Sequence, residues 1–347
     1  MKKVIYVFLL FSSLLFCQNI DISKKDFYFL KGNIGSTPIS MYLYIDNNNN
    51  LSGKYYYDTI KQIINIKGSI NGNSFHLEES INDRVIGSLD GEISGEISGE
   101  MVFTGNWVSA DKNNTFSFSF YIDNNYPINK IKIINASLNV KEDNGTFEAS
   151  RDAVIIANEK KVKAINKISL DVDETKSIDE ENITTTLNNL ISSQYNTWKE
   201  AINDKFNMQR NIEVSFIDEN IISFSLYNYS YAGGAHGIYN IQPNIYLISN
   251  GKRVGLSVSE LIEDVADIDL INLMRIKLTE NMSESDFFDF NSITLSDTFD
   301  ITPTGIKFIW PAYKISDYAH GIIEIEFRYS ELKPFVKEDS VFMYLFE

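Results

Sequence analysis

Met41-Tyr-Leu-Tyr-Ile45 and Phe116-Ser-Phe-Ser-Phe120 are two of several short stretches in which large apolar residues alternate with smaller or polar ones. Similar runs fill residues 27–121 and are separated by Gly and Asn. Strict alternation places apolar side chains on one face of a strand, and residues 47–50, 71–72 and 111–114 supply turn residues that tolerate positive φ. The pattern predicts an all-β domain over residues 24–126, arranged as an antiparallel meander or barrel.

The pattern changes after residue 127, where a second unit with both helices and strands is expected. Strands are predicted at 131–140, 153–157, 212–217, 221–231 and 245–248, and again at 305–310, 322–327 and 341–346. Apolar residues recur at three- and four-residue steps over 180–206, which predicts an amphipathic helix that packs on a sheet. Further helices are expected at 258–264 and 267–280, and a short one at 330–336 that begins with a Ser330 cap. The predicted fold class is α+β: a barrel-like β domain, then a sheet-and-helix domain over residues 131–347.

The N-terminus has the pattern of a secretory signal. Lys2 and Lys3 precede an apolar run that ends at Phe16, and this run is too short to span a bilayer. Residues 1–17 are therefore predicted to be a signal peptide, with the protein exported to the periplasm or cell surface. Cys17 is the only cysteine and a possible lipidation site. However, lipoprotein signals place a small residue where Phe16 stands, so we favour simple cleavage near Cys17 and Gln18.

Composition excludes some classes of function. The chain has 347 residues, a formal net charge of -16 and 44% hydrophobic residues, which indicates two or three folded domains with an acidic surface. Nucleic-acid binding is not expected, because it needs clustered Lys and Arg. Cationic partners fit the charge better, although acidity is more often a solubility device. No later segment is apolar enough to be a transmembrane helix.

Two glycine-containing stretches carry the candidate site residues. The first is Tyr229-Ser-Tyr-Ala-Gly-Gly-Ala-His-Gly237, in which a strand runs into a loop, and the second runs from Trp310 to Gly321. His236 is either a ligand or acid-base group on an exposed loop, or a hydrogen-bonded fixture of that loop; we favour the second interpretation because no catalytic partner is evident. The candidate ligand-binding residues are Tyr229, Tyr231, Gly233, Gly234, His236, Tyr239, Tyr313, Tyr318 and His320.

Motifs for catalysis are weak. A zinc site would need carboxylates to complete it, because the chain has three histidines, namely His76, His236 and His320, and no thiol after the signal. Neither a Gly-x-Ser-x-Gly motif nor a phosphate-binding glycine loop is present. The pair Glu78-Glu79 is expected on a solvated strand, where adjacency does not indicate a glycosidase. Trp107 is expected at a strand start as a core residue. No cofactor, metal or catalytic residue is therefore predicted.

The order of several motifs resembles a known family. They are Tyr231-Ala-Gly-Gly-Ala-His-Gly237, the Asn250-Gly-Lys252 turn, Leu256, Leu261, Gly305-Ile-Lys-Phe308, Tyr313, Tyr318-Ala319, Gly321, Tyr329-Ser330 and Leu332. From about Ile131 onward the chain resembles the extracytoplasmic domain of RsiV-type anti-sigma factors and PdaC-type peptidoglycan deacetylases. The resemblance implies an α+β module outside the membrane; in the anti-sigma branch this module recognises lysozyme.

Departures from the family limit what the resemblance implies. The sequence shows neither a cytoplasmic sigma-binding segment nor a transmembrane helix, and it lacks a deacetylase domain with His and Asp metal ligands. In addition, His320 stands where relatives more often have another residue. The leading hypothesis is a non-enzymatic envelope protein that binds a lysozyme-like cationic protein or a glycan such as peptidoglycan. The alternatives are a metal-assisted enzyme acting on envelope glycan, with His236, His320 and a carboxylate, and a structural surface component.

Overall fold

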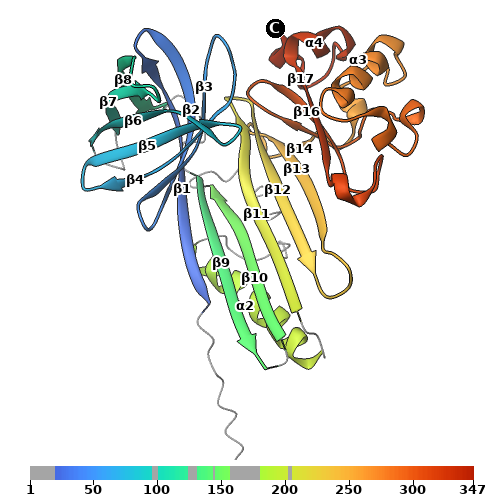
Figure 1. Cartoon of the computed structure of the whole chain (residues 1–347), viewed down its shortest axis with the longest axis horizontal. Helices are drawn as coiled ribbons and strands as arrows, with labels where there is room; N and C mark the ends of the chain where they lie inside the picture. The colour runs from blue at the N-terminus through green and yellow to red at the C-terminus, as the bar shows by residue number, and fades with distance from the viewer. Residues whose placement is uncertain (1–19, 96–100, 124–130, 144, 157–179, 202–204) are drawn as a thin grey trace, which may run out of the picture.

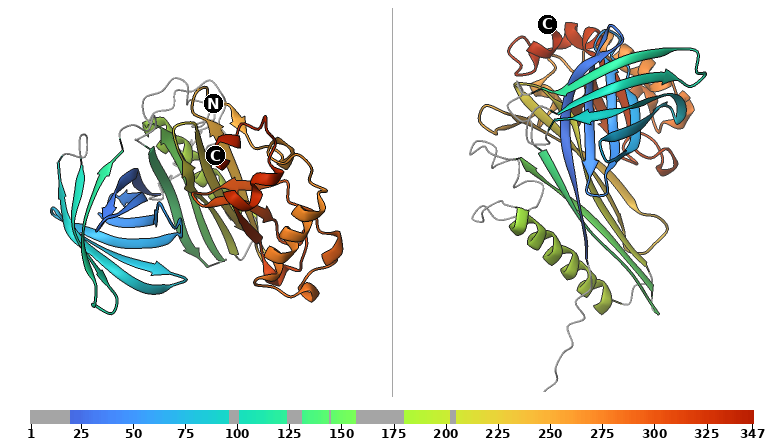
Figure 2. Two further views of the ribbon diagram at one scale, coloured as in Figure 1. Left: turned by 90° about the horizontal axis from the view of Figure 1, so that it is seen from above. Right: turned by 90° about the vertical axis from the view of Figure 1, so that its left-hand side faces the viewer.

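The computed structural model describes residues 20–95, 101–123, 131–143, 145–156, 180–201 and 205–347. Three parts follow one another across the molecule (Figures 1 and 2): a β-barrel, a long twisted sheet with one covering helix, and a C-terminal part of short helices and strands. The predicted α+β class, with a barrel at the N-terminal end, is confirmed. The signal peptide and Cys17 lie outside the described residues, so both stay predictions.

The barrel is an antiparallel meander of β1 (Asp21–Ile34), β2 (Thr37–Asp46), β3 (Asn50–Tyr57), β4 (Ile64–Asn71), β5 (Ser74–Ile81), β6 (Arg84–Ser94), β7 (Val102–Ser109) and β8 (Thr115–Ile122). Pairing of β8 with the second half of β1, from Leu30↔Ile122 to Ile34↔Phe118, closes it. The predicted turns at 47–50, 71–72 and 111–114 connect neighbouring strands, with Asn49, Gly72 and Lys112 at positive φ. Alternation of apolar residues thus places one face of every strand inside.

The barrel interior is tightly filled. Phe75, Phe103, Phe118 and Phe120 are among its buried side chains, and the rings of Phe118 and Phe120 stack with centroids 4.6 Å apart. Gly105 makes room for this packing, because a Cβ there would lie 2.1 Å from the carbonyl oxygen of Asp90 and 2.8 Å from the Phe118 ring. The barrel is therefore a packed core among the described residues.

One carboxyl group lies inside the barrel, and the expectation of a solvated Glu79 was wrong. Glu79 is fully buried, and accepts hydrogen bonds of 2.7 Å from the Tyr55 hydroxyl and 2.7 Å from the Trp107 indole N–H. Burial raises the pKa of Glu79, while these two donors oppose the rise. Trp107 lies within β7 rather than at its start, half-buried and stacked on Phe116. Glu79 alternates with Phe75 and Leu77 along β5, and all three side chains are buried on the inner face.

β1 belongs to two parts of the molecule. Its first half, Asp21 to Phe27, pairs with β9 (Ile131–Glu142), whereas its second half closes the barrel. As a result the described strands form one 14-stranded sheet in the order β14-β13-β12-β11-β10-β9-β1-β2-β3-β4-β5-β6-β7-β8. Tyr42 and Tyr44, on the outside of the barrel, are buried in a core shared with the sheet, and the Tyr44 hydroxyl accepts from the Val214 N–H at 2.9 Å. The expected boundary near residue 127 lies outside the described residues, and the division into domains stays a prediction.

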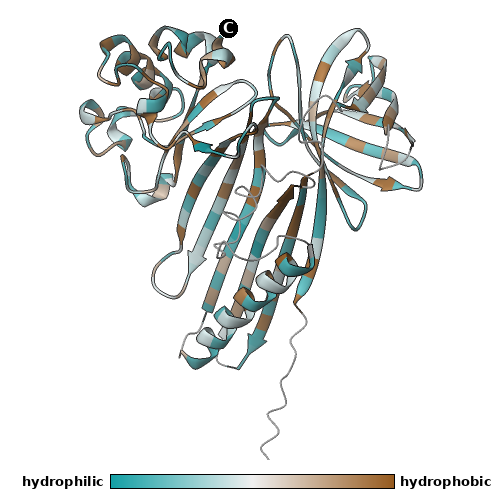
Figure 3. Cartoon of the chain, turned by 180° about the vertical axis from the view of Figure 1, so that it is seen from behind, coloured by the Kyte–Doolittle hydropathy of each residue, from teal (hydrophilic) through white to brown (hydrophobic). Residues whose placement is uncertain are grey.

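The long sheet continues through β10 (Gly145–Ile156), β11 (Lys205–Ile217), β12 (Ile221–Tyr231), β13 (Ile238–Leu247) and β14 (Arg253–Val254). β10 and β11 are parallel, and the helix α2 (Glu180–Glu200) comes between them in the chain and covers β9 and β10 (Figure 3). Ile183, Leu187, Ile191 and Trp198 are buried against Phe147 and its neighbours. The predicted amphipathic helix is confirmed, but it ends at Glu200, and Phe206 lies in β11.

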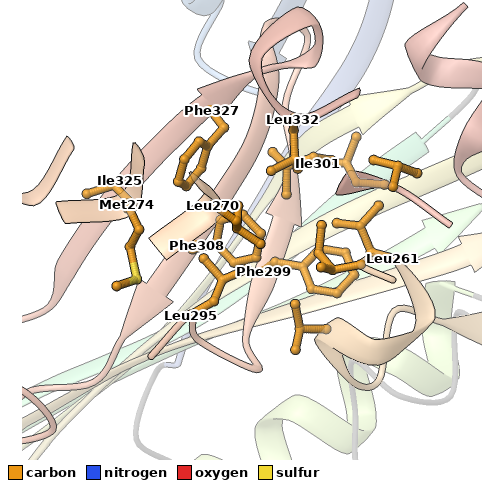
Figure 4. Packing of buried hydrophobic residues seen from close by; sticks show 14 of the residues in the cluster. Leu261, Leu270, Met274, Leu295, Phe299, Ile301, Phe308, Ile325, Phe327 and Leu332 are labelled. Atoms are coloured by element: carbon orange, nitrogen blue, oxygen red, sulfur yellow. The ribbon is translucent and has the colours of Figure 1, made fainter. Parts of the chain in front are cut away.

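The C-terminal part packs on β11 to β13. It contains η2 (Val258–Glu260), α3 (Ile268–Thr279), η3 (Glu284–Asp286), η4 (Phe290–Ser292), β15 (Phe299–Ile301), β16 (Gly305–Trp310), η5 (Tyr318–His320), β17 (Ile323–Arg328), α4 (Tyr329–Leu332), η6 (Lys333–Phe335) and η7 (Met343–Phe346). Phe299, Phe308, Phe327 and Leu332 lie in its buried core (Figure 4). Buried Asp300 accepts hydrogen bonds from the hydroxyls of Ser215 and Ser223 at 2.9 and 2.6 Å, and from that of Ser225. This carboxylate joins the C-terminal part to the sheet.

Three local predictions in this part were wrong. Residues 341–346 form no strand but end in the 3-10 helix η7, and the expected helix at 258–264 is only the single turn η2. The late helix begins at Tyr329 with Arg328 as its N-cap, so Ser330 is not the cap. For residues 341–346, a short apolar run fits a helix or a strand equally well, and tertiary packing decides between them. Within the described residues, no helix is long and apolar enough to cross a membrane.

Candidate functional site

Two segments far apart in the sequence bring aromatic side chains together at one end of the long sheet. One is the β12–β13 hairpin, and the other is the loop between β16 and β17. In the hairpin, Tyr229 and Tyr239 face each other across the strands, with ring centroids 4.6 Å apart. Buried Gly237 lies against this pair, because a Cβ on it would be 2.3 Å from the Tyr229 ring. The glycine is needed here for close packing.

His236 joins the hairpin to the loop. Its ring stacks on Tyr318, with centroids 3.7 Å apart and an interplanar angle of 21°, and its Nε2 lies 3.2 Å from the Tyr313 hydroxyl. The Tyr318 hydroxyl donates to the carbonyl oxygen of Gly237. His236 is thus both held in place by hydrogen bonds and exposed on the surface. We call Tyr229, His236, Tyr239, Tyr313 and Tyr318 the aromatic patch.

The patch is open to solvent but partly desolvated. Tyr239 is 50% and Tyr313 56% exposed. Burial raises the pKa of Tyr318, and the nearby hydroxyls of Tyr239, Tyr229 and Tyr313 add to the rise. Tyr313 has a φ of 68°, a left-handed conformation that a bulky residue adopts at a cost. The chain therefore holds these rings in place at the surface.

The other predicted site residues lie around the patch rather than in it. The Tyr231 hydroxyl donates to the Gly234 carbonyl at 2.9 Å, which supports the loop from within. Gly233 and Gly234 have φ of 97° and 100°, and nothing lies within 4 Å of the Cβ that either residue would carry. They form the exposed tip, and the positive φ inferred from their sequence is present.

His320 is not a partner of His236. Its Nδ1 lies 2.8 Å from Oδ1 of Asp317 and 3.1 Å from Oγ of Ser316, both in its own loop. Asp317 also caps η5, and the hydrogen bond from His320 holds the pKa of this carboxyl below its usual value. Sequence reasoning missed Ser316 and Asp317, although Asp is one of the preferred N-cap residues.

The geometry does not favour the metal hypothesis. In the part of the chain that the structure describes, no three His, Cys, Asp or Glu side chains come close enough to hold a metal ion. His236 is surrounded by tyrosine rings, which are poor ligands for zinc compared with imidazole, thiolate or carboxylate. The chemistry that this arrangement offers is contact through ring faces and hydroxyl groups.

Comparison with known proteins gives the class of domain. Residues 111–239 match the family model described as Deacetylase PdaC, and residues 266–330 match that of a protein family of unknown function, DUF3298. The chain thus carries the PdaC/DUF3298 domain pair, which the motif resemblance implied from about Ile131 onward, although the first match begins at residue 111, before β8 of the barrel. The pair indicates an envelope-associated protein. The patch draws on both matched regions, with Tyr229, His236 and Tyr239 in the first and Tyr313 and Tyr318 in the second.

Two solved structures of DUF3298 family proteins match part of the chain. One from Bacteroides fragilis is 15% identical with a TM-score of 0.43, and covers 59% of this chain and 94% of its own. One from Pseudomonas aeruginosa is 14% identical with a TM-score of 0.41 and covers the same 59% and 94%. No curated protein matches the chain.

Proposed function

We propose that this protein is an exported, non-enzymatic binding protein of the cell envelope, and that the aromatic patch binds envelope glycan. The observation that supports this proposal is the convergence of five exposed or half-exposed rings from two segments on one surface. The rings are held by packing and by the Tyr318 to Gly237 hydrogen bond, so little conformational entropy is lost when a ligand binds.

The chemistry of the patch fits a sugar chain. The C–H faces of pyranose rings pack on aromatic faces, while their hydroxyls need donors and acceptors at the rim. The hydroxyls of Tyr239 and Tyr313 provide both, as does the ring of His236. The match to the model named for a peptidoglycan-related deacetylase makes peptidoglycan the first glycan to test.

The test is calorimetric titration of the mature protein with soluble peptidoglycan glycan fragments. Tyr313→Ala removes an exposed ring, and we expect a roughly ten-fold loss of affinity, as for loss of about 1.4 kcal/mol at a central contact. The control is Tyr121→Ala, because Tyr121 is equally exposed, at 51%, but lies on the barrel. Equal affinity of wild type and Tyr313→Ala, or no binding by either, would refute the proposal.

A second candidate ligand is a cationic protein such as lysozyme. The net charge of -16 favours it, since a negative field accelerates the approach of a cationic partner. Binding of lysozyme that weakens strongly between low and high salt would support this ligand, whereas glycan binding through ring faces depends little on salt. Absence of lysozyme binding at low salt would remove this candidate.

Export and anchoring need a separate measurement. The mass of the mature N-terminus distinguishes cleavage near Gln18 from acylation of Cys17. An unprocessed chain that begins at Met1 would contradict export.

A further inference from the structure

The β12–β13 hairpin contains no charged residue. From Ile221 to Gly251 the sequence has no Asp, Glu, Lys or Arg, although the chain has 47 acidic and 31 basic residues. The hairpin includes exposed Ile238 and Tyr239. Edge strands are usually protected by charged side chains, so an uncharged edge needs an explanation.

One edge of β13 is open over part of its length. β13 pairs along its whole length with β12, from Ile238↔Ser230 to Leu247↔Ile221. On its other side, β14 pairs with it only at Ile245 and Tyr246. Residues before Pro243 therefore have no neighbouring strand on that side within the described residues.

Four backbone groups are free on this edge. Leu247 directs its N–H and C=O toward the β14 side, where the N–H donates to the backbone carbonyl of Lys252 at 2.9 Å. Bonding direction alternates along an antiparallel strand, so Pro243, Ile241 and Tyr239 face the same way. Pro243 has no N–H, and its carbonyl accepts from Arg253 at 3.4 Å. Among the described residues, the N–H and C=O of Tyr239 and Ile241 have no partner.

We propose that this edge pairs with the same edge of a second copy of the chain. In an antiparallel pair centred on Asn240, Tyr239 of each copy lies opposite Ile241 of the other. All four free groups of each copy are then bonded, with two hydrogen bonds at each pair of residues. The next pair would be Pro243 opposite Gly237. The ladder ends there because Pro243 has no N–H and the Gly237 carbonyl is already bonded to Tyr318. The edge is therefore complementary to itself.

The lack of charge on the hairpin and the side chains along its edge favour a second copy as the partner. Two chains of net charge -16 repel each other, and the uncharged hairpin is a surface where they can approach. Tyr239 opposite Ile241 is an aromatic and β-branched pair, which stabilises antiparallel strands. The ladder is short, so we expect a weak dimer with a dissociation constant in the micromolar range or above.

Sedimentation equilibrium of the mature protein from micromolar to near-millimolar concentration tests the dimer. Asn240→Asp places two like charges opposite each other, and we expect the dissociation constant at low salt to rise about five-fold or more. Asn250→Asp adds the same charge in an exposed turn and should leave the dimer unchanged. High salt should reduce the difference between the two variants.

Two further measurements locate the contact. The amides of Tyr239 and Ile241 should exchange rapidly with solvent at low concentration and become protected as concentration rises. In a Cys17→Ser background, Asn240→Cys should form a disulfide-linked dimer, because the Cα atoms of facing residues at such a pair lie about 4.5 Å apart. The control variant Ser249→Cys should form no such dimer. A monomer at every concentration, or a dimer unaffected by Asn240→Asp and uncrosslinked by Asn240→Cys, would overturn the proposal.

Discussion

The barrel and the β12–β13 hairpin use aromatic residues in opposite ways. In the barrel, pairing of β1 with β8 closes the sheet, and Phe103, Phe118 and Phe120 fill the interior. In the hairpin, one edge of β13 is partly open, and Tyr239 stays half-exposed. Rings in the barrel stabilise the fold, whereas we infer that rings in the hairpin recognise a ligand. The same kind of substitution, made once in the barrel and once in the hairpin, tests this difference.

The largest expected contrast comes from removing one ring in each region. Phe118→Ala empties a site that is 4% exposed in the packed barrel, and we expect about 3–5 kcal/mol loss of unfolding free energy. Tyr239→Ala removes a ring that is 50% exposed, and should cost less than about 1 kcal/mol. Denaturant unfolding of both variants measures the two values. Similar losses would show that the hairpin rings are also core residues.

A smaller contrast is expected for Gly→Ala substitutions. In the barrel, Gly105→Ala drives a Cβ against the backbone of β6, and overpacking of this kind costs about 1–3 kcal/mol or more. At the hairpin tip, Gly234→Ala has free space, and only its φ of 100° is unfavourable, so we expect about 1 kcal/mol. In thermal unfolding, the melting temperature of Gly105→Ala should be well below that of Gly234→Ala. The opposite ranking would contradict the packed interior.

The smallest effect is a dependence of stability on pH. Burial raises the pKa of Glu79 in the folded state, so the folded protein binds the proton more tightly than the unfolded chain. As the pH falls through the range just above the ordinary Glu pKa, wild type should therefore gain stability relative to Glu79→Gln.

Exposed Asp111 has a pKa lowered by the Ser109 and Asn113 hydrogen bonds. Wild type should consequently lose stability relative to Asp111→Asn as the pH falls through that lowered pKa.

The test is whether the difference in unfolding free energy between wild type and each variant rises or falls on acidification. Unfolding free energies by urea at several pH values give the difference between wild type and each variant. If wild type lost stability relative to Glu79→Gln on acidification, the Glu79 carboxyl would be better stabilised in its charged form than its burial implies.

Local patterns predicted most elements because they depend on neighbouring residues. Alternation identified the barrel strands, and three- and four-residue spacing identified α2. The same reasoning failed at residues 341–346 and for Glu79, where surroundings supplied by distant segments decide the outcome. For the candidate site, sequence reasoning selected the tyrosines and His236. One alternative hypothesis also paired His236 with His320, which instead bonds to its own loop.

The sequence by itself determined the barrel strands, the helix α2, the glycine-rich tip and the candidate aromatic residues, because each follows from side-chain periodicity or from local backbone freedom. Only the tertiary structure decided that β1 joins the barrel to the long sheet, that His236 stacks on Tyr318, and that β13 leaves four backbone groups free. These features depend on contacts between residues far apart in the chain, such as Gly237 and Tyr318, which are separated by 81 positions. No local pattern encodes such contacts, since they form only when separate elements pack together.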